Sequence, residues 1–573
     1  MPPPTTSPRS SARDATSATC IEPVPPARIS TAQPFFAPPV FLRLMKSLVA
    51  LLFAAGAAFT GAAATAAAVP PPAPIAPVPT EAQLRWHETE TFSLIHYGLN
   101  TYTNREWGFG NESPSLFNPA RFDANQIAGA LKTGGMNGLI LVAKHHDGFC
   151  LWPTKTTPHN ITLAPFRDGK GDVVREFADA TRAAGLRFGI YCSPWDRNHP
   201  EYARSGYVKT YHAQLLELLT NYGELFEFWF DGANGGDGYY GGAKGGKGER
   251  RSINAATYYG WREIFALVKK HQPGAVIFSD VGPGSRWVGN EHGYAAPESW
   301  PTLTPAAPKS KRVAVGENKF KEVANNAAGG AGDDAANVPT PGNCDWSRNP
   351  TGERFGKQWL PAECDVPMRA GWFWHPGKKE ERRRPPAKLM DIYFSSVGRG
   401  GALNLGIAPD RDGLVCDHDL KTLTTFGNAL RATFAKNLAA GATTTASNTR
   451  GERGDNAGYL PKNVLDGDRY SYWATDDGVT TGELTLTLPA PVEFNVVRLR
   501  ENIKLGHRVG KFVVEARVDG EWREVFAGEA IAACRLHWQK DKPIRADAVR
   551  LRVLEARGPL AISEFGIYRM PKL

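Results

Sequence analysis

Apolar runs alternate with amphipathic segments along residues 85 to about 410. Runs that end at turn residues predict buried strands, at 92–98, 138–144, 187–193, 225–231 and 275–280. Between them, apolar positions recur at helical spacing, over 172–184, 202–222 and 256–271. This alternation predicts a parallel sheet. A length of about 320 residues suits a (β/α)8-type barrel with insertions, and no glycine-rich phosphate loop follows the first strand, as a doubly wound sheet would favour.

The pattern changes after a predicted helix at 417–438. From there to the end, short runs rich in Thr, Val and Leu alternate with turns, for example at 483–488, 496–501 and 511–518. Such spacing is typical of an all-β sandwich. The sequence therefore predicts an α/β chain with a barrel at 85–438, followed by a β-sandwich domain at 439–573.

The N-terminal residues 1–84 are interpreted as a targeting region followed by a linker. Residues 1–44 are rich in Pro, Ser, Thr and Ala, and we interpret them as a disordered leader or a mis-called start upstream of Met45. Residues 45–68 combine a basic start, a short apolar core and small residues, as a secretory signal peptide does. A membrane anchor is the alternative, although the apolar core is short. We expect export to the periplasm or beyond, no membrane association after cleavage, and a stiff Pro-rich linker at 69–84.

Composition narrows the function only slightly. The 573 residues carry a formal charge of +9, but no dense basic helix or nucleic-acid motif accompanies it, so no nucleic-acid partner is expected. The 15 Trp are a weak sign of sugar binding. The seven Cys lack metal-site spacing. Cys344 and Cys364 flank one loop and could form a disulfide in an oxidising compartment.

Carboxylates at strand ends supply the candidate chemistry. Asp231 closes an apolar and aromatic run and is followed by glycine. In a parallel barrel that end of a strand carries the active site, whereas a helix N-cap is the structural alternative. Glycoside hydrolysis needs a second carboxylate. Glu291 stands in a loop flanked by Trp, Gly and Asn, with Glu298 and Glu363 as rivals.

Several segments between residues 85 and 410 together resemble glycoside hydrolase family 29, the α-L-fucosidases. The most specific are Lys-His-His-Asp-Gly-Phe at 144–149 and Trp-Phe-Asp-Gly at 229–232. The others are Phe-Ser-Leu-Ile-His-Tyr-Gly at 92–98, Asn-Arg-Glu-Trp-Gly at 104–108, Trp-Val-Gly-Asn-Glu at 287–291, Gly-Trp-Phe-Trp-His at 371–375 and Asn-Leu-Gly at 404–406.

The resemblance implies an exported retaining exo-α-L-fucosidase without a cofactor. Asp231 would be the nucleophile and Glu291 the general acid/base. Other positions would contact the sugar, Arg286 would position Glu291 or the sugar, and Trp372 or Trp374 would pack on the fucose methyl. The implied substrate-binding residues are His96, Glu106, Trp107, His145, His146, Trp229, Arg286, Trp372 and Trp374.

Residues 100–108 (Asn-Thr-Tyr-Thr-Asn-Arg-Glu-Trp-Gly) and 287–291 (Trp-Val-Gly-Asn-Glu) resemble the subgroup that prefers branched α-1,3/1,4-linked fucose. The expected partner is therefore a fucosylated oligosaccharide. We expect the Gly-rich loop at 233–251 to recognise the leaving group through Tyr239 and Tyr240. The alternatives are a non-catalytic fucose-binding lectin on the same scaffold and a hydrolase of another sugar, such as galactose. The sequence leaves the natural glycan and the oligomeric state open.

Metal binding remains an open alternative at two places. In the barrel, the run His145-His146-Asp147 offers ligands but lacks a recognised metal spacing. The C-terminal domain resembles the discoidin, or factor 5/8 type C, module that family 32 carbohydrate-binding modules share. Its oxygen-rich turn at Asp466 and Asp468 could hold a structural calcium ion. The plainer interpretation is a sandwich that only supports the barrel.

Overall fold

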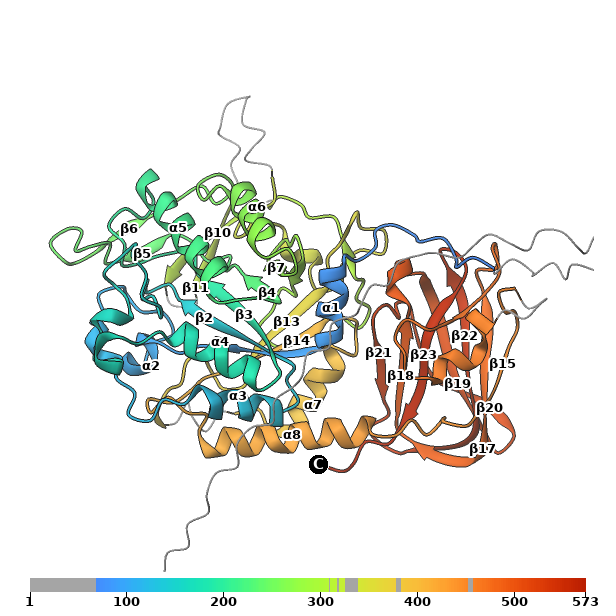
Figure 1. Ribbon diagram of the computed structural model, residues 1–573. Coiled ribbons are helices and arrows are strands. Elements are labelled where there is room, and N and C mark those ends of the chain that lie inside the picture. The colour runs from blue at the N-terminus through green and yellow to red at the C-terminus, as the bar shows by residue number, and fades with distance from the viewer. Residues whose placement is uncertain (1–68, 309, 317–318, 325–337, 378–382, 452–456) are drawn as a thin grey trace, which may run out of the picture. The chain divides into compact units, whose positions relative to one another are not determined.

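Eight parallel strands close into a barrel, as the sequence predicts (Figure 1). The computed structural model describes residues 69–573 except 309, 317–318, 325–337, 378–382 and 452–456. Each barrel strand pairs with its neighbours in chain order, and the last strand pairs with the first. The strands are β1 (Thr91–Ile95), β2 (Gly138–Lys144), β3 (Arg187–Cys192), β4 (Glu227–Trp229), β7 (Val276–Ser279), β8 (Ser285–Trp287), β13 (Ala362–Pro367) and β14 (Ala402–Ile407).

Helices cover the barrel because their apolar faces need the sheet's outer surface. Local signals begin some of them: the Asp123 and Asp172 side chains accept backbone hydrogen bonds at the starts of α3 and α4. The helices are α1 (Glu81–Thr89), α2 (Leu99–Thr103), α3 (Ala124–Thr133), α4 (Val173–Ala183), α5 (Ser205–Asn221), α6 (Trp261–His271), α7 (Pro386–Ser395) and α8 (Asp417–Phe434).

All five predicted strands are present, but the last three strands of the barrel, β8, β13 and β14, were not located from the sequence. β8 follows β7 after a five-residue connection and pairs with it in parallel, with Phe278 opposite Ser285. The sequence pattern places Trp287 in a loop instead. A three-residue strand is too short to display an alternating pattern, so only its pairing with β7 and β13 identifies it.

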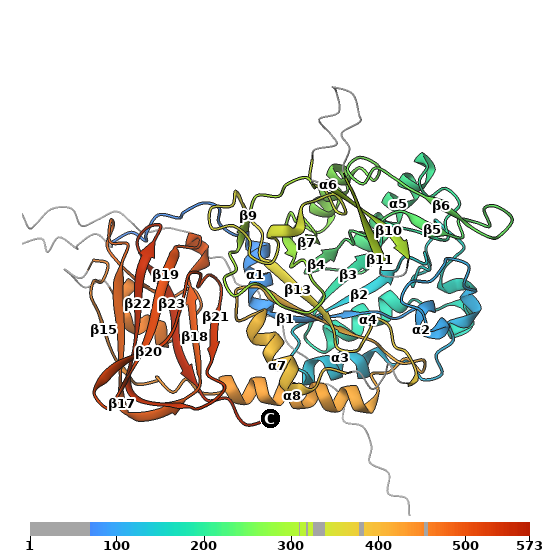
Figure 2. The ribbon, with the colours of Figure 1, turned by 180° about the vertical axis from the view of Figure 1, so that it is seen from behind.

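Two long loops, at residues 233–251 and 302–350, contain small sheets of their own (Figure 2). In the first, β5 (Gly236–Gly238) pairs with β6 (Glu249–Arg251). In the second, β10 (Ser310–Gly316) pairs with β11 (Lys319–Ala324), so this segment is not a plain loop. β9 (Thr302–Leu303) pairs with β12 (Gln358–Trp359). The Ala, Gly and Lys content of the second loop predicts a mobile middle, and these residues lie largely outside the described ones.

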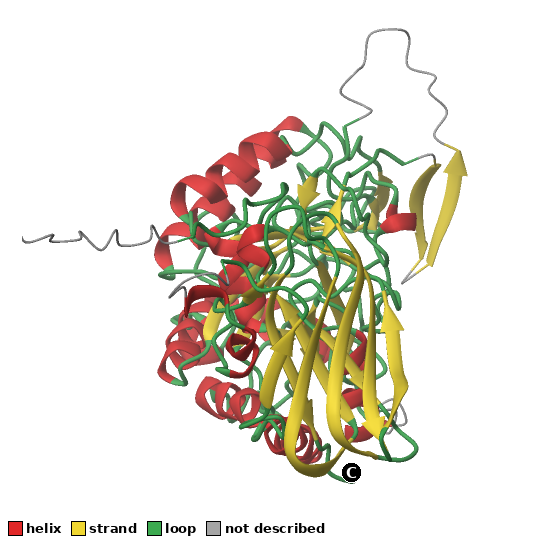
Figure 3. Ribbon diagram, turned by 90° about the vertical axis from the view of Figure 1, so that its right-hand side faces the viewer, coloured by secondary structure: helices red, strands yellow, loops and turns green. Residues whose placement is uncertain are grey.

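The C-terminal part is a sandwich of two antiparallel sheets, as predicted (Figure 3). Its core includes Trp473, Phe512 and Phe565, each fully buried. One sheet has the order β15 (Thr443–Ala446), β17 (Gly482–Phe494), β22 (Ile544–Ala556), β19 (Val509–Val518) and β20 (Glu521–Gly528). The other has the order β16 (Trp473–Ala474), β23 (Ala561–Tyr568), β18 (Val496–Glu501) and β21 (Arg535–Trp538).

The Pro-rich segment is not a free spacer. The backbone of Ile75 donates to Leu505 O at 2.9 Å, and Arg450 Nε donates to Pro70 O at 2.7 Å. Its last residues, from Glu81, already belong to α1. Proline leaves carbonyl groups without competing N–H donors, so the segment can pack along the sandwich. The predicted leader and signal peptide lie outside the described residues.

The described residues contain no helix long and apolar enough to cross a membrane. Their six cysteines, including Cys344 and Cys364, are all free thiols. The disulfide that we considered is therefore not formed. Cys344 instead lies beside Asp280, while Cys364 is fully buried within β13.

Candidate active site

A cavity of about 430 Å³ opens at the carboxyl ends of the barrel strands. This volume is in the range of small-ligand sites, about 300–1,000 Å³. The lining residues are Leu94, His96, Trp107, His145, His146, Tyr191, Trp229, Asp231, Gly232, Ala233, Phe278, Asp280, Trp287, Asn290, Glu291, His292, Trp346, Asp365 and Trp372.

Asp231 occupies the centre of this pocket, two residues after β4 ends at Trp229. Its Oδ2 accepts a hydrogen bond from Tyr191 OH at 2.8 Å, and its Oδ1 accepts one from the backbone of Ala233 at 2.6 Å. Burial raises the pKa of Asp231 to about 6, against the effect of these two donors. The carboxyl group is thus fixed in orientation and mostly ionised at neutral pH.

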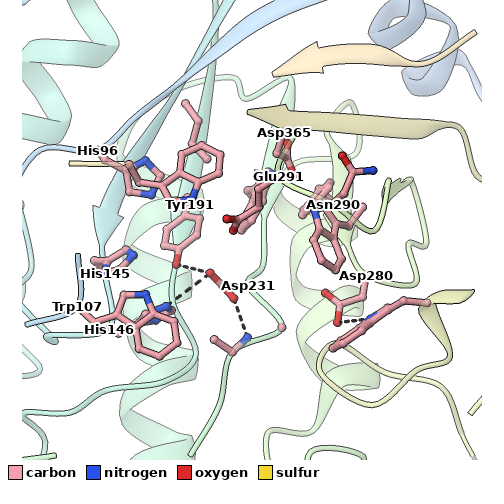
Figure 4. A pocket seen from close by; sticks show the side chains of 18 of the residues that line it. His96, Trp107, His145, His146, Tyr191, Asp231, Asp280, Asn290, Glu291 and Asp365 are labelled. Carbon is pink, nitrogen blue, oxygen red and sulfur yellow. Dashed lines mark hydrogen bonds and ion pairs between the residues drawn. The ribbon is translucent and has the colours of Figure 1, made fainter. Parts of the chain in front are cut away.

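Glu291 faces Asp231 across the pocket (Figure 4). Its side chain opens to the cavity, yet burial within the pocket raises its pKa, so it keeps a proton to higher pH than an ordinary glutamate. The two rival glutamates lie elsewhere. Glu298 accepts hydrogen bonds from the backbone of Glu529 and from Arg535, both in the sandwich. Glu363 is fully buried inside the barrel.

Three buried histidines line one side of the pocket. His146 Nδ1 lies 2.8 Å from Ser193 Oγ, and its Nε2 lies 3.7 Å from Asp231 Oδ2. His145 Nδ1 lies 3.5 Å from Asn100 Nδ2. Adjacent residues in a strand point to opposite faces, but β2 has already ended at Lys144, so both imidazoles can face the cavity. Burial lowers the pKa of His96, His145 and His146 well below the usual value, which keeps them neutral.

The other charged residues of the same motif have structural contacts. Lys144 Nζ donates to Gln214 Oε1 at 2.9 Å and to Tyr207 OH at 3.0 Å, and it pairs with the buried Asp196 at 3.5 Å. Asp147 Oδ1 accepts from the backbone of Phe149. Within the described ranges, no three His, Cys, Asp or Glu side chains are grouped to hold a metal ion.

Aromatic residues complete this side of the pocket. Trp107 meets the His146 ring edge-on at 5.1 Å, and Trp372 lies 5.0 Å from the His96 ring. We call His96, His145, His146 and Trp107 the histidine side. Glu106 does not line the pocket; its Oε2 accepts from the backbone of Trp372 at 2.9 Å, and its Oε1 contacts His375. Glu106 therefore braces the pocket wall in this structure.

Two further predicted sugar contacts, Arg286 and Trp374, lie outside the pocket. Arg286 is fully buried, and its guanidinium donates to the carbonyl groups of Asn349, Leu360 and Trp300. The prediction that Arg286 positions Glu291 or the sugar is wrong for this structure, because β8 directs the side chain away from the cavity. Of the two candidate tryptophans Trp372 and Trp374, only Trp372 lines the pocket.

Sequence reasoning missed the opposite side of the pocket. Asp280 follows β7 and is 5% exposed; its Oδ2 accepts from Trp346 Nε1 at 3.1 Å and from the backbone of Gly342 at 2.9 Å. Trp346 meets Trp287 edge-to-face at 5.7 Å. We call Asp280, Trp287 and Trp346 the tryptophan side. The position of Asp280 at a strand end, like that of Asp231, could have predicted it as a pocket residue. Trp346 comes from the second long loop, where no sequence pattern predicts a pocket residue.

The first long loop does not form this side. Of residues 233–251, only Ala233 lines the pocket. Tyr240 is 1% exposed, stacks on Tyr202 at 5.6 Å and donates to Gly236 O. The backbone of Tyr239 donates to Phe109 O. The expectation that Tyr239 and Tyr240 supply stacking surfaces beside the nucleophile is therefore wrong, because the loop folds back on its neighbours.

Comparisons with known proteins agree on one family. Residues 78–311 match the family model Alpha-L-fucosidase, and residues 443–565 match F5/8 type C domain. The chain is 36% identical over 500 residues to alpha-L-fucosidase 1 of Arabidopsis thaliana, which covers 87% of this chain and 88% of the relative. The chain belongs to the α-L-fucosidases of glycoside hydrolase family 29.

Solved structures of this family superpose along most of the chain. A glycoside hydrolase 29 family member from an unknown rumen bacterium is 36% identical, with a TM-score of 0.70 over 88% of this chain and 79% of that one. A family 29 fucosidase of Ruminococcus gnavus in complex with fucose is 30% identical, with a TM-score of 0.72 over 88% of this chain and 97% of that one. Members of this family are retaining glycoside hydrolases.

The F5/8 type C domain of this family 29 enzyme contains the turn that we considered for calcium. Asp466 Oδ1 accepts from the backbone of Asp468, and Asp468 Oδ1 accepts from the backbone of Tyr470, each at 2.8 Å. Tyr470 OH in turn contacts Glu88 of α1 at 2.6 Å. The two aspartates thus shape a turn that packs on the barrel, in line with a supporting role, and the calcium site stays a prediction.

Proposed function

We propose that Asp231 is the nucleophile and Glu291 the general acid/base of a retaining α-L-fucosidase. Asp231 attacks the anomeric carbon, and Glu291 protonates the departing glycosidic oxygen; Glu291 then deprotonates a water molecule that releases fucose from Asp231. The protonation states support these roles. A pKa of about 6 leaves Asp231 ionised at neutral pH, and the raised pKa of Glu291 favours its acid form.

Fucose binds, on this proposal, against the histidine side. Neutral imidazoles both donate and accept hydrogen bonds, as sugar hydroxyls do. His146 is fixed by Ser193 and lies beside Asp231, so it can reach a hydroxyl next to the anomeric carbon. Trp229 and Trp372 supply apolar surface for the sugar ring and its methyl group.

The leaving group binds against the tryptophan side. Figure 4 places His96, His145 and His146 on one side of Asp231 and Glu291, and Asp280 and Asn290 on the other. The bond that breaks lies between the two carboxyl groups, so a sugar on the histidine side directs its leaving group toward Trp287 and Trp346. A pocket that continues past Glu291 leaves room for a leaving-group sugar. Together with the subgroup resemblance of residues 100–108 and 287–291, this supports our proposal of a preference for branched α-1,3/1,4-linked fucose.

A comparison of substrates tests the linkage preference. We expect Lewis a or Lewis x trisaccharide to be hydrolysed at least about tenfold faster than 2′-fucosyllactose, measured as kcat/KM by fucose release. That ratio corresponds to about 1.4 kcal/mol of additional contact in the transition state. Equal rates on the two kinds of oligosaccharide would remove the linkage proposal and leave the fucosidase activity intact.

We also propose that the enzyme is exported to the periplasm or secreted. The basis is the basic start, apolar core and small-residue end of residues 45–68. Expression of the full chain in a bacterial host, followed by N-terminal sequencing of the mature protein, tests this. Cleavage near Ala68 is the expected result, whereas a protein that retains residues 45–68 in the cytoplasm contradicts it.

A further inference from the structure

Three carboxyl groups lie together inside the barrel, beneath the pocket. Glu227 of β4 and Glu363 of β13 are fully buried, and Asp365 of β13 is 2% exposed. Ser285 Oγ lies 3.2 Å from Glu227 Oε1 and 3.5 Å from Glu363 Oε2, so one hydroxyl connects the two glutamates. Glu363 and Asp365 are two residues apart on one strand and therefore point to the same face. We call Glu227, Glu363 and Asp365 the carboxyl column.

The neighbours of the carboxyl column are neutral. Trp86 Nε1 donates to Glu227 Oε2 at 2.9 Å. Glu363 Oε1 accepts from Trp229 Nε1 at 3.0 Å and from Asn404 Nδ2 at 2.9 Å. Within the described part of the chain, no ion pair to a lysine, arginine or histidine involves the column. Several buried anions without a cation would cost many kcal/mol, so such groups keep their protons instead.

The pKa shifts of the three carboxyl groups also favour their protonated forms. Burial raises the pKa of Glu227 and of Asp365 well above the usual value, and the neighbouring Glu363 adds to both shifts. Burial also raises the pKa of Glu363, against the hydrogen bonds that it accepts. The column therefore carries at most a small part of the three negative charges that its composition would suggest.

Asp365 is the member that reaches the substrate cavity. It lines the pocket and lies close to Glu291 in Figure 4. Both of its carboxyl oxygens are buried and form no hydrogen bond of good geometry, although the side chains of Glu363 and Asn404 lie near enough to interact with them. Glu227 and Glu363 are better satisfied, since each accepts a hydrogen bond from a tryptophan N–H. A weakly hydrogen-bonded polar group beside a ligand cavity is well placed to form a hydrogen bond with the ligand.

We propose that Asp365 is a further substrate-binding residue of this α-L-fucosidase, a neutral carboxylic acid that donates a hydrogen bond to one ring hydroxyl of the bound fucose. A carboxylate can only accept, whereas the acid form has an O–H to donate. Burial without a cation among the described residues keeps Asp365 in this form, and the neighbouring Glu363 adds to the effect. This inference rests on the proposal that the pocket holds fucose beside Asp231.

Deoxy substrates test the proposal. The measurement is kcat/KM on aryl α-L-fucosides in which the 2-, 3- or 4-hydroxyl is singly replaced by hydrogen, for the wild type, Asp365→Ala, Asp365→Leu and Asp365→Asn. We expect Asp365→Ala and Asp365→Leu to lose about tenfold on the parent fucoside and almost nothing on one of the deoxy substrates. Asp365→Asn should stay within about threefold of the wild type, because its amide N–H also donates.

Three outcomes would overturn the proposal. Asp365→Leu slowing all deoxy substrates by the same factor would mean that the residue only supports the fold. Full activity of Asp365→Leu on the parent would mean that no contact exists. Asp365→Asn as slow as Asp365→Leu would exclude a neutral donor. Leu is similar to Asp in size, so this variant keeps the test open if Asp365→Ala does not fold.

Two control variants separate the possible failures. Glu227→Gln alters the same column without lining the pocket, so any loss of rate should be equal on every deoxy substrate. Asp231→Ala tests the pocket itself. If Asp231→Ala retains turnover, the proposed function fails first; if it is inactive while Asp365 variants show no selective loss, only the proposal on Asp365 fails.

Discussion

The histidine side and the tryptophan side of the pocket are built by different means. The histidines directly follow β1 and β2, and their rings are buried and in contact, with His145 and His146 only 4.1 Å apart. On the tryptophan side, Asp280 follows β7 and Trp287 ends β8, whereas Trp346 comes from the second long loop and is held by Asp280. Strand ends fix side chains more rigidly than loops do. We therefore expect the histidine side to bind fucose in a fixed geometry, and Trp346 on the tryptophan side to adapt to the leaving group.

The largest loss of activity should come from removing the Asp231 carboxylate, which lies between the histidine side and the tryptophan side. We expect Asp231→Ala to lower kcat for aryl fucoside by at least about 10⁴-fold, equivalent to about 5.4 kcal/mol, while the protein stays folded and still binds fucose. Azide should restore part of the activity, because a small anion can replace the missing carboxylate. Near-normal turnover by purified variant would exclude Asp231 as the nucleophile.

Glu291→Ala should separate substrates by their leaving groups. We expect a loss of about 10²- to 10⁴-fold in kcat/KM on oligosaccharides, which need a proton on the departing oxygen, and a much smaller loss on activated aryl fucosides. Parallel assays of Glu298→Ala serve as the control, since Glu298 contacts the sandwich. If Glu298→Ala gives the selective loss instead, the general acid is assigned wrongly.

A variant on the histidine side should affect every substrate alike. We expect His146→Ala to lower kcat/KM about 30-fold, equivalent to about 2 kcal/mol for one lost hydrogen bond and its unpaired partner. The factor should be the same for fucosyl fluoride, aryl fucoside and Lewis trisaccharides. A loss confined to the trisaccharides would place His146 in the leaving-group site and reverse the comparison.

A variant on the tryptophan side should discriminate between substrates. We expect Trp346→Ala to lower kcat/KM on Lewis trisaccharides about tenfold, or about 1.4 kcal/mol, through lost contact with the sugar ring. Fucosyl fluoride has no ring in its leaving group and should react normally. Tyr239→Ala, in the loop that folds away from the pocket, is the matched aromatic control and should change neither rate. Equal losses on fluoride and trisaccharide would contradict this assignment.

The smallest effect concerns pH. Asp231 acts as a carboxylate, and its pKa of about 6 means that kcat/KM should fall as the pH drops through about 6, by roughly twofold at that pH. Tyr191→Phe removes a donor that favours the ionised form, so it should move this acid limb to higher pH. An acid limb that does not move in Tyr191→Phe would show that another group controls it.

Some site residues could be predicted because their position in the pocket follows from the chain alone. Asp231 lies two residues after β4, at the end of an apolar run, and parallel strand ends converge at one edge. His145 and His146 follow β2, but the family resemblance was needed to place both in the pocket. Arg286 looked similar, but its short strand points it into the protein, where three carbonyl groups bind it. Glu106 proved to brace Trp372 from behind.

The sequence by itself determined the barrel and the sandwich, because both depend on local periodicity, and the family resemblance supplied the histidine side. Only the tertiary structure decided the tryptophan side and the carboxyl column. Trp346 meets Trp287 through Asp280, and Glu227 approaches Glu363 through closure of the barrel. Contacts between residues so far apart in the chain leave no periodic signal. Their energies depend on burial and partners, which exist only once the chain has folded.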